Sequence, residues 1–273
     1  MPWSEIIGFA AIFLMGATLG IIGAGGSILT VPILVYLFRI DATLATTYSL
    51  VLVGTTAAAG GFRYALRGEF DHDAFLSFGI PSVISVYFTR RYLLPAVPET
   101  IGSLGEIELT RDGLIMVVFA GFMLVAAVLM IRGKAKDEGE IPENGKKKSA
   151  LYRRFFAATE GFVIGGITGM VGAGGGFLIV PALVWLMGLP IKRAVSTSLL
   201  IIAAKSLLGF VGDLQASSAL DWKFLLVLLG LSAVGIFVGG KVGKKLPSYW
   251  LQRGFGWFVL MAGLFVIGSE LCA

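Results

Sequence analysis

Two clusters of small residues are the part of this sequence best suited to bind a small ligand. They comprise Gly23, Ala24, Gly25, Gly26 and Ser27 in the first half, and Gly172, Ala173, Gly174, Gly175 and Gly176 in the second. Each cluster divides an apolar stretch, and the apolar piece after it is about 11 residues long, which as a helix spans roughly half of a bilayer's hydrocarbon core. A helix that starts at such a break directs its free N–H groups and its positive dipole end at the break. Two such ends at one depth would form a receptor for a small anion.

Hydroxyl groups and one lysine lie in the apolar segments after the breaks. The candidate binding side chains are Thr47 and Ser49 in the first half, and Ser196, Ser198 and Lys205 in the second. A hydroxyl can satisfy itself on its own helix backbone, but the matched positions in the two halves favour a shared cavity. A lysine in mid-membrane is costly unless it faces a cavity or a counter-charge, so Lys205 is a candidate for the anion site. The alternative is that Lys205 extends its ammonium to the membrane interface.

Other interpretations of these residues predict different functions. Glycines can also let membrane helices pack closely, but packing glycines recur at fixed helical spacing, whereas here three or four fall together. The third glycine of a dinucleotide fingerprint and its strand context are missing. The chain has one His and one Cys, and it contains no zinc-protease, nucleophile-elbow or Cys-His motif. We therefore predict no catalytic residue, no metal site and no cofactor, and we do not expect an enzyme.

The elements that must position these residues are membrane helices. Of the 273 residues, 56% are hydrophobic and 14% are charged, whereas a soluble domain carries about 25% charged residues. Several apolar runs reach the length of roughly 18 residues that crosses a bilayer. The net charge of +5 does not predict nucleic-acid binding, because the basic residues lie beside the apolar segments, where they set membrane orientation.

The apolar segments occur twice in the same order. A constant shift of 149 positions relates Gly20 to Gly169, Pro32 to Pro181 and Gly60 to Gly209. We predict an all-α, polytopic membrane bundle of two inverted repeats, each with a glycine-broken re-entrant-type helical hairpin plus three spanning helices, a plan that secondary transporters use. The predicted units are a first membrane repeat at 1–132, a charged linker at 133–154 and a second membrane repeat at 155–273.

The distribution of charge predicts the orientation. The central linker is rich in Lys and Arg, so it should be cytoplasmic. Alternation then places an acidic loop with Asp213 and Asp221 outside, and the C-terminus outside. Arg90 and Arg91 are expected at the outer end of their segment, where their charge argues against this orientation.

The paired glycine motifs, each followed by Pro32 or Pro181 and then by Ala45–Leu50 or Ala194–Leu199, resemble the TauE/SafE family of sulfite exporters. The resemblance implies a prokaryotic-type permease for small sulfur-containing anions such as sulfite, thiosulfate or organosulfonates. The function we expect is a secondary transporter in the inner membrane, which holds the anion between the two glycine breaks and uses a coupling proton or cation. The alternative is an anion channel.

Overall fold

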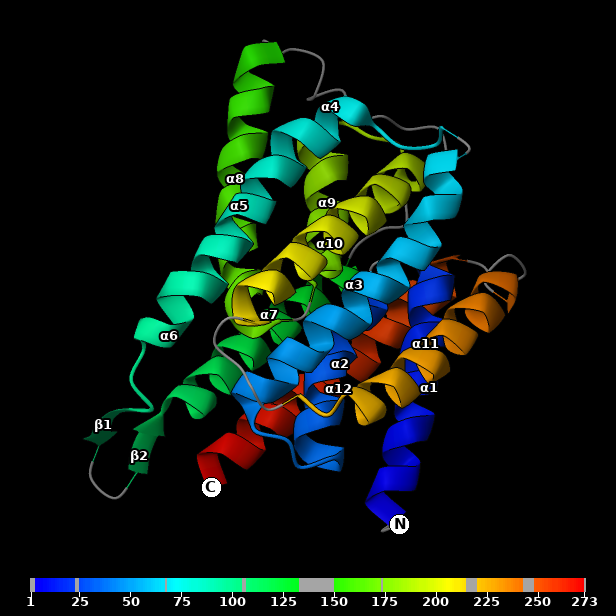
Figure 1. Cartoon of the computed structure of the whole chain (residues 1–273). Helices are drawn as coiled ribbons and strands as arrows, with labels where there is room; N and C mark the ends of the chain where they lie inside the picture. Colours follow the sequence, from blue (N-terminus) through cyan, green and yellow to red (C-terminus); the bar gives the residue numbers. More distant parts are fainter. Residues whose placement is uncertain are drawn as a thin grey trace.

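The computed structural model describes residues 3–22, 25–66, 68–104, 107–132, 150–172, 174–214, 220–242 and 248–272. Long helices form a bundle, to which one β-hairpin is attached (Figure 1). The predicted all-α class is confirmed. The hairpin, β1 (Thr100–Leu104) paired antiparallel with β2 (Ile107–Thr110), was not predicted, because the alternation of Ile107 and Leu109 with polar residues covers only four positions.

The first half contains five helical segments: a first helix, a short second one after the glycine break, a long third helix, a composite fourth helix and a long fifth helix. Its elements are α1 (Trp3–Ile22), η1 (Gly25–Leu29), α2 (Thr30–Pro32), η2 (Ile33–Leu37), α3 (Ala42–Leu66), α4 (His72–Ala74), η3 (Phe75–Gly79), α5 (Ile80–Phe88), η4 (Thr89–Leu93), α6 (Leu94–Ala96) and α7 (Arg111–Arg132). The wide π-helical turns η3 and η4 each end shortly before a proline, Pro81 or Pro95. A proline lacks the N–H of the regular helical ladder, and a π turn accommodates that loss.

The second half has the same order of elements with fewer interruptions. It consists of α8 (Ala150–Val171), α9 (Gly176–Leu186), α10 (Ile191–Leu214), α11 (Trp222–Val242) and α12 (Ser248–Cys272). Helix α9 has 11 residues, the length expected for the piece that follows a glycine break. In the first half the equivalent stretch from Gly25 to Leu37 is helical too, but it changes between 3₁₀, α and π turns.

Lipid is the solvent of this bundle. Among the described residues, four helices are long and apolar enough to cross a membrane, at Ala42–Phe62, Arg111–Val128, Arg193–Asp213 and Trp222–Val242. Large apolar side chains such as Leu226, Phe237 and Phe265 are exposed on the outside of the bundle. A water-soluble protein rarely exposes so many, so the chain is a multi-pass membrane protein.

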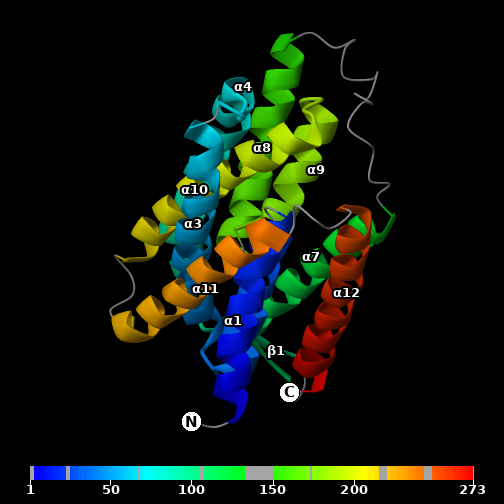
Figure 2. The ribbon, with the colours of Figure 1, turned by 90° about the vertical axis from the view of Figure 1, so that its right-hand side faces the viewer.

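Helices of the two halves pack in reciprocal pairs. Helix α1 packs on α11 and α5 packs on α8, so the first helix of each half contacts the fourth of the other. The third helices, α3 and α10, pair with each other, and the fifth helices, α7 and α12, do the same (Figure 2). Both chain ends and the β-hairpin lie at one end of the bundle, whereas α4 and the start of α8 lie at the other (Figure 1).

Hydrogen bonds at equivalent positions repeat this reciprocity. The backbone N–H of Asp71 donates to Thr197 Oγ1 at 2.9 Å, and the backbone N–H of Asp221 donates to Tyr48 Oη at 2.7 Å. Both aspartates also cap the helix that follows them. These contacts tie each helix start of one half to the third helix of the other half.

Glycines bring the paired helices into backbone contact. A Cβ on Gly165 would lie 2.5 Å from the carbonyl oxygen of Ser82, and a Cβ on Gly16 would meet the carbonyl oxygen of Ser232. In lipid, helix association depends on close packing rather than on the hydrophobic effect. The packing alternative raised for glycine is thus correct for these positions, which lie outside the two clusters.

Two charged residues occupy positions other than those expected. Asp213 was predicted in an acidic outer loop, but it lies inside α10 and is 5% exposed. Arg90 was expected at a segment end, but its side chain in η4 is fully buried. The predicted loop position of Asp213 was wrong, because the charges of Asp213 and Arg90 compensate each other inside the bundle, which a rule based on single charges cannot detect. The outer side of this end of α10 stays a prediction.

We expect Gly235→Val to destabilise the protein, because a Cβ there meets the backbone of Phe13 and lies 2.9 Å from the backbone nitrogen of Ala17. Overpacking of this kind costs about 1–3 kcal/mol, so the thermal transition in detergent should fall. Gly230→Val is the matched control on the same helix, since nothing lies within 4 Å of a Cβ at that position. Equal transition temperatures for the two variants would contradict the observed α1–α11 packing.

Candidate functional site

The second glycine cluster forms a sharp break between α8 and α9. Gly172, Gly174 and Gly175 adopt left-handed φ angles of 71°, 66° and 67°, which residues with a Cβ rarely adopt. The Gly175 carbonyl accepts from the N–H groups of Leu178 and Ile179 at 3.0 and 3.1 Å and so starts α9. The hydroxyl of Ser49, on α3, donates to the Gly172 carbonyl at 2.8 Å and holds the break in place.

The two breaks meet inside the bundle. Element η1, which follows the first break, packs against α9, which follows the second. Ser27 is fully buried, and a Cβ on Gly174 would lie 3.6 Å from its Oγ. The same Cβ would lie 2.6 Å from Val53 Cγ1. Space at this point therefore requires glycine, whatever the backbone angle.

Lys205 faces the second break. Its side chain is 1% exposed, and its Nζ donates to Thr168 Oγ1 at 2.7 Å. A Cβ on Gly175 would lie 2.8 Å from this Nζ. The lysine thus does not extend to the membrane interface, and its Nζ lies beside the second break.

A buried ion pair lies on the other side of the same break. Arg90 Nη1 is 2.9 Å from Asp213 Oδ2 and also donates to Thr46 Oγ1 at 2.9 Å. The hydroxyl of Thr47 donates to Asp213 Oδ2 at 2.8 Å. The network joins α3, η4 and α10, three elements that line the break.

The guanidinium of Arg90 has more donors than this network uses. Within the described part of the chain, Nε and Nη2 are buried and have no hydrogen-bond partner. A Cβ on Gly172 would lie 2.8 Å from Nη2, so this free edge borders the break. Sequence reasoning missed Arg90 and Asp213 as site residues.

The structural correspondence of the two halves singles out Arg90. The contacts of Ser82 and Ser232 with Gly165 and Gly16 relate the fourth segments of the two halves by a shift of 150. At that shift the position of Arg90 is occupied by Gly240 in the second half. A charge that replaces a glycine inside an otherwise repeated apolar segment marks a residue with its own role.

The predicted site residues divide into four groups, of which Ser196 and Ser198 form the last. Ser27, Ser49, Gly172, Gly174, Gly175 and Lys205 come together at the break, Gly176 begins α9, and Thr47 joins through Asp213. Gly25 begins η1, and Gly26 packs on α1 near Thr18 Oγ1. Gly23, Ala24 and Ala173 lie outside the described residues.

Ser196 and Ser198 are used elsewhere. Ser196 donates to the backbone carbonyl of Glu69, in the connection before α4. Ser198 donates to the Val195 carbonyl of its own helix at 2.8 Å. Neither hydroxyl has a contact with the break in the described part of the chain, so the matched serines of the second half serve the fold.

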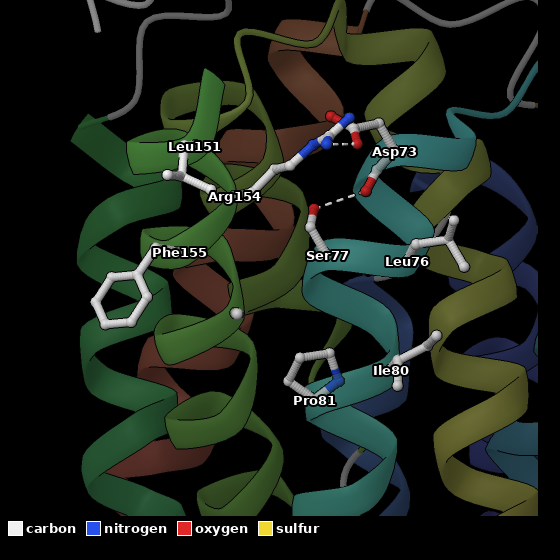
Figure 3. Close-up of a pocket in the computed structure, with 9 residues that line it drawn as sticks. Asp73, Leu76, Ser77, Ile80, Pro81, Leu151, Arg154 and Phe155 are labelled. Atoms are coloured by element: carbon white, nitrogen blue, oxygen red, sulfur yellow. Dashed lines mark hydrogen bonds and ion pairs between the residues drawn. The ribbon is translucent and has the colours of Figure 1, made fainter. Parts of the chain in front are cut away.

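A separate open pocket lies between α8 and the composite helix that begins at α4 (Figure 3). Leu76, Ile80, Pro81, Leu151 and Phe155 provide most of its lining. At its rim, Arg154 Nε is 2.8 Å from Asp73 Oδ1, and both side chains are exposed. The pocket lacks the buried cations of the break, and no group of His, Cys, Asp or Glu that could hold a metal occurs among the described residues.

Comparison with known proteins defines the class. The chain is 27% identical to a "Probable membrane transporter protein" of Xylella fastidiosa (strain 9a5c), over 93% of this chain and 91% of that protein. It is also 27% identical to the "Probable membrane transporter protein YunE" of Bacillus subtilis (strain 168), over 94% of each chain. No solved structure matches the chain.

The fold and these relatives define a multi-pass membrane transporter. The family model "Sulfite exporter TauE/SafE" matches residues 7–266, and the chain belongs to this family. The resemblance seen in the glycine motifs is therefore confirmed over nearly the whole length.

We expect Asp213→Ala to lower the thermal transition strongly, because it leaves Arg90 buried without its counter-charge. Removal of one partner of a buried pair costs about 3–5 kcal/mol. The double variant Arg90→Gln, Asp213→Asn removes both charges and should be less destabilised than Asp213→Ala. Thermal unfolding of purified protein measures the difference. A double variant that is less stable than Asp213→Ala would contradict a stability role for the charge pair.

Proposed function

We propose that the protein is a secondary transporter that moves a small sulfur-containing anion, such as sulfite, thiosulfate or an organosulfonate, across an inner membrane. The observation that carries the proposal is the second glycine break, whose left-handed backbone lies beside the buried ammonium of Lys205. The name of the family model supports the sulfur-containing substrate. A proton or cation is the proposed coupling ion.

The proposed binding place lies between the two glycine breaks. Irregular backbone at membrane depth persists where it is buried in protein or lines a wet cavity. The start of α9 contributes backbone N–H groups, and the buried hydroxyl of Ser27 approaches from the first break. Among the described residues no ion pair of Lys205 is present, and an anion there would supply its counter-charge.

We also propose that residues 1–132 and 155–273 are inverted repeats that exchange the exposure of this site. The reciprocal pairs α1–α11 and α5–α8 support the repeat, since each half uses the same surfaces on the other. Re-entrant hairpins are supported by the packing of η1 and η2 on α1 and of α9 on α8. Two equivalent arrangements of such halves are the structural basis of alternating access.

Uptake into proteoliposomes tests the function. If the protein is a transporter, proteoliposomes preloaded with unlabelled sulfite should accumulate labelled sulfite by counterflow, and the uptake rate should saturate with sulfite concentration. An anion channel should show neither behaviour. Gly174→Val should abolish uptake, because a branched Cβ conflicts with the backbone angle and with Val53. Gly121→Val is the control, since its Cβ would meet nothing within 4 Å. Undiminished uptake by folded Gly174→Val would overturn the site.

For Lys205 we expect substitution by Gln to weaken sulfite binding at least tenfold. A charged hydrogen bond contributes about 1.5–3 kcal/mol, and about 1.4 kcal/mol corresponds to a tenfold change in Kd. Lys205→Glu should abolish binding through repulsion, whereas Lys205→Arg should keep part of it. Titration of purified protein gives the affinities, with the exposed Lys223→Gln as control. Equal affinities of the wild type and folded Lys205→Gln would remove Lys205 from the site.

The proposed topology places the linker at 133–154 in the cytoplasm and the C-terminus outside. In Figure 1 both chain ends and the β-hairpin lie at one end of the bundle, and α4 and the start of α8 lie at the other. This arrangement supports the proposal that the C-terminus and the linker lie on opposite sides of the membrane. A membrane-impermeant maleimide should therefore label Cys272 in intact cells. It should label Ser149→Cys, made in a Cys272→Ser background, after the cells are opened. The reverse pattern would invert the topology.

A further inference from the structure

We propose that the free Nε–Nη2 edge of Arg90 is the part of the site that selects the substrate, by binding two coplanar oxygens of one oxyanion. This rests on the function proposed above and identifies both a residue and a chemical class. The class comprises sulfonates, hydrogen sulfite and other anions that present two oxygens on one atom, as opposed to a monatomic anion such as chloride.

The first step concerns unsatisfied donors. Arg90 is 0% exposed, and the ion pair with Asp213 and the bond to Thr46 both use Nη1. Nε and Nη2 are buried and have no partner among the described residues. A buried donor without a partner loses its hydrogen bonds to water and gains none in exchange. Native proteins seldom retain such a donor unless another partner occupies it at some stage.

The second step concerns shape. Nε and one terminal nitrogen of a guanidinium form a planar edge with two parallel N–H bonds, which matches two oxygens of a carboxylate or sulfonate. The network with Asp213 and Thr46 holds Nη1 on the opposite side. The guanidinium is thereby fixed through Nη1, and its Nε–Nη2 edge has no partner among the described residues.

The third step concerns location. A Cβ on Gly172 would lie 2.8 Å from Nη2, and a Cβ on Gly175 would lie 2.8 Å from Lys205 Nζ. The two glycines are three residues apart, so their Cα atoms are separated by at most about 11 Å. Arg90 and Lys205 therefore border one short break, Arg90 at Gly172 and Lys205 at Gly175.

A purely structural role does not explain this arrangement. A clamp that joins η4 to α3 and α10 needs Nη1 alone, and a lysine could supply it. The planar head of arginine, its complete burial and the free edge at the break are accounted for together by a ligand with two acceptor oxygens.

The test compares binding of methanesulfonate and of chloride to the purified full-length protein. Arg90→Lys keeps the positive charge and can still pair with Asp213, but it loses the planar edge. We expect its Kd for methanesulfonate to rise at least tenfold, while its Kd for chloride changes less than threefold. The matched control is Arg91→Lys, the next residue of the same element, whose guanidinium carbon lies 5.9 Å from the Tyr92 ring centre. This control should leave both affinities unchanged.

The outcomes separate this inference from the proposed function. Wild-type protein that neither binds methanesulfonate nor transports any sulfur oxyanion would overturn both. Wild-type binding together with an unchanged methanesulfonate-to-chloride preference in Arg90→Lys would overturn the role of Arg90 alone. If Arg90→Lys does not fold, Arg90→Gln with Asp213→Asn removes both charges of the pair. Wild-type affinity of that double variant for methanesulfonate would equally overturn the proposal.

Discussion

The pairing of Arg90 with Asp213 is the interaction on which the centre of this protein depends. An isolated guanidinium in a medium of low dielectric constant is strongly unfavourable, so η4 can bury Arg90 because α10 provides a carboxylate 2.9 Å away. Two hydroxyls on α3 complete the network: that of Thr46 accepts from Arg90, and that of Thr47 donates to Asp213. The pair therefore fixes three helices around the second glycine break, and two further donors of Arg90, Nε and Nη2, have no partner in the described part of the chain.

Close backbone contact provides the rigid frame in which that pair can persist. In lipid there is no gain from the removal of apolar surface from water, so the helices must fit closely to hold together. Glycines at the α1–α11 and α5–α8 crossings let one backbone lie against another. A frame of this kind tolerates little increase in side-chain volume at its helix crossings. The glycines of the frame and those of the breaks have distinct roles. In the frame they remove a Cβ from a contact, and at the break they allow a left-handed backbone.

The sequence predicted the class of fold and part of the candidate site, for reasons that can be traced to particular residues. Apolar length and the shift between Gly20 and Gly169 are properties of the chain itself, so the helices, their order and the short α9 could be predicted. Lys205 could be predicted because a lone charge in an apolar segment is visible without a structure. Arg90 and Asp213 could not, since each lies near the end of an apolar segment and is 123 positions from its partner. Ser196 and Ser198 were predicted at the site, but their hydroxyls bond elsewhere. A matched position in the repeat fixes the place of a residue but not the direction of its hydroxyl.

The departures from the repeat locate the chemistry better than the repeat does. Equivalent contacts, such as those of Asp71 with Thr197 and of Asp221 with Tyr48, are present in both halves and hold the frame. The buried charges, in contrast, have no charged counterpart at the equivalent positions of the other half. Lys205 corresponds to Thr56 at a shift of 149, Asp213 corresponds to Tyr64 at the same shift, and Arg90 corresponds to Gly240 at a shift of 150. All three contribute to one break, so the first break supplies Ser27 and helix ends while the second holds the charge. In the proposed transporter, a frame with two equivalent halves would change its arrangement at low cost, because each contact that one half loses has a counterpart in the other. The single set of charges would then be the one binding place that such a change exposes.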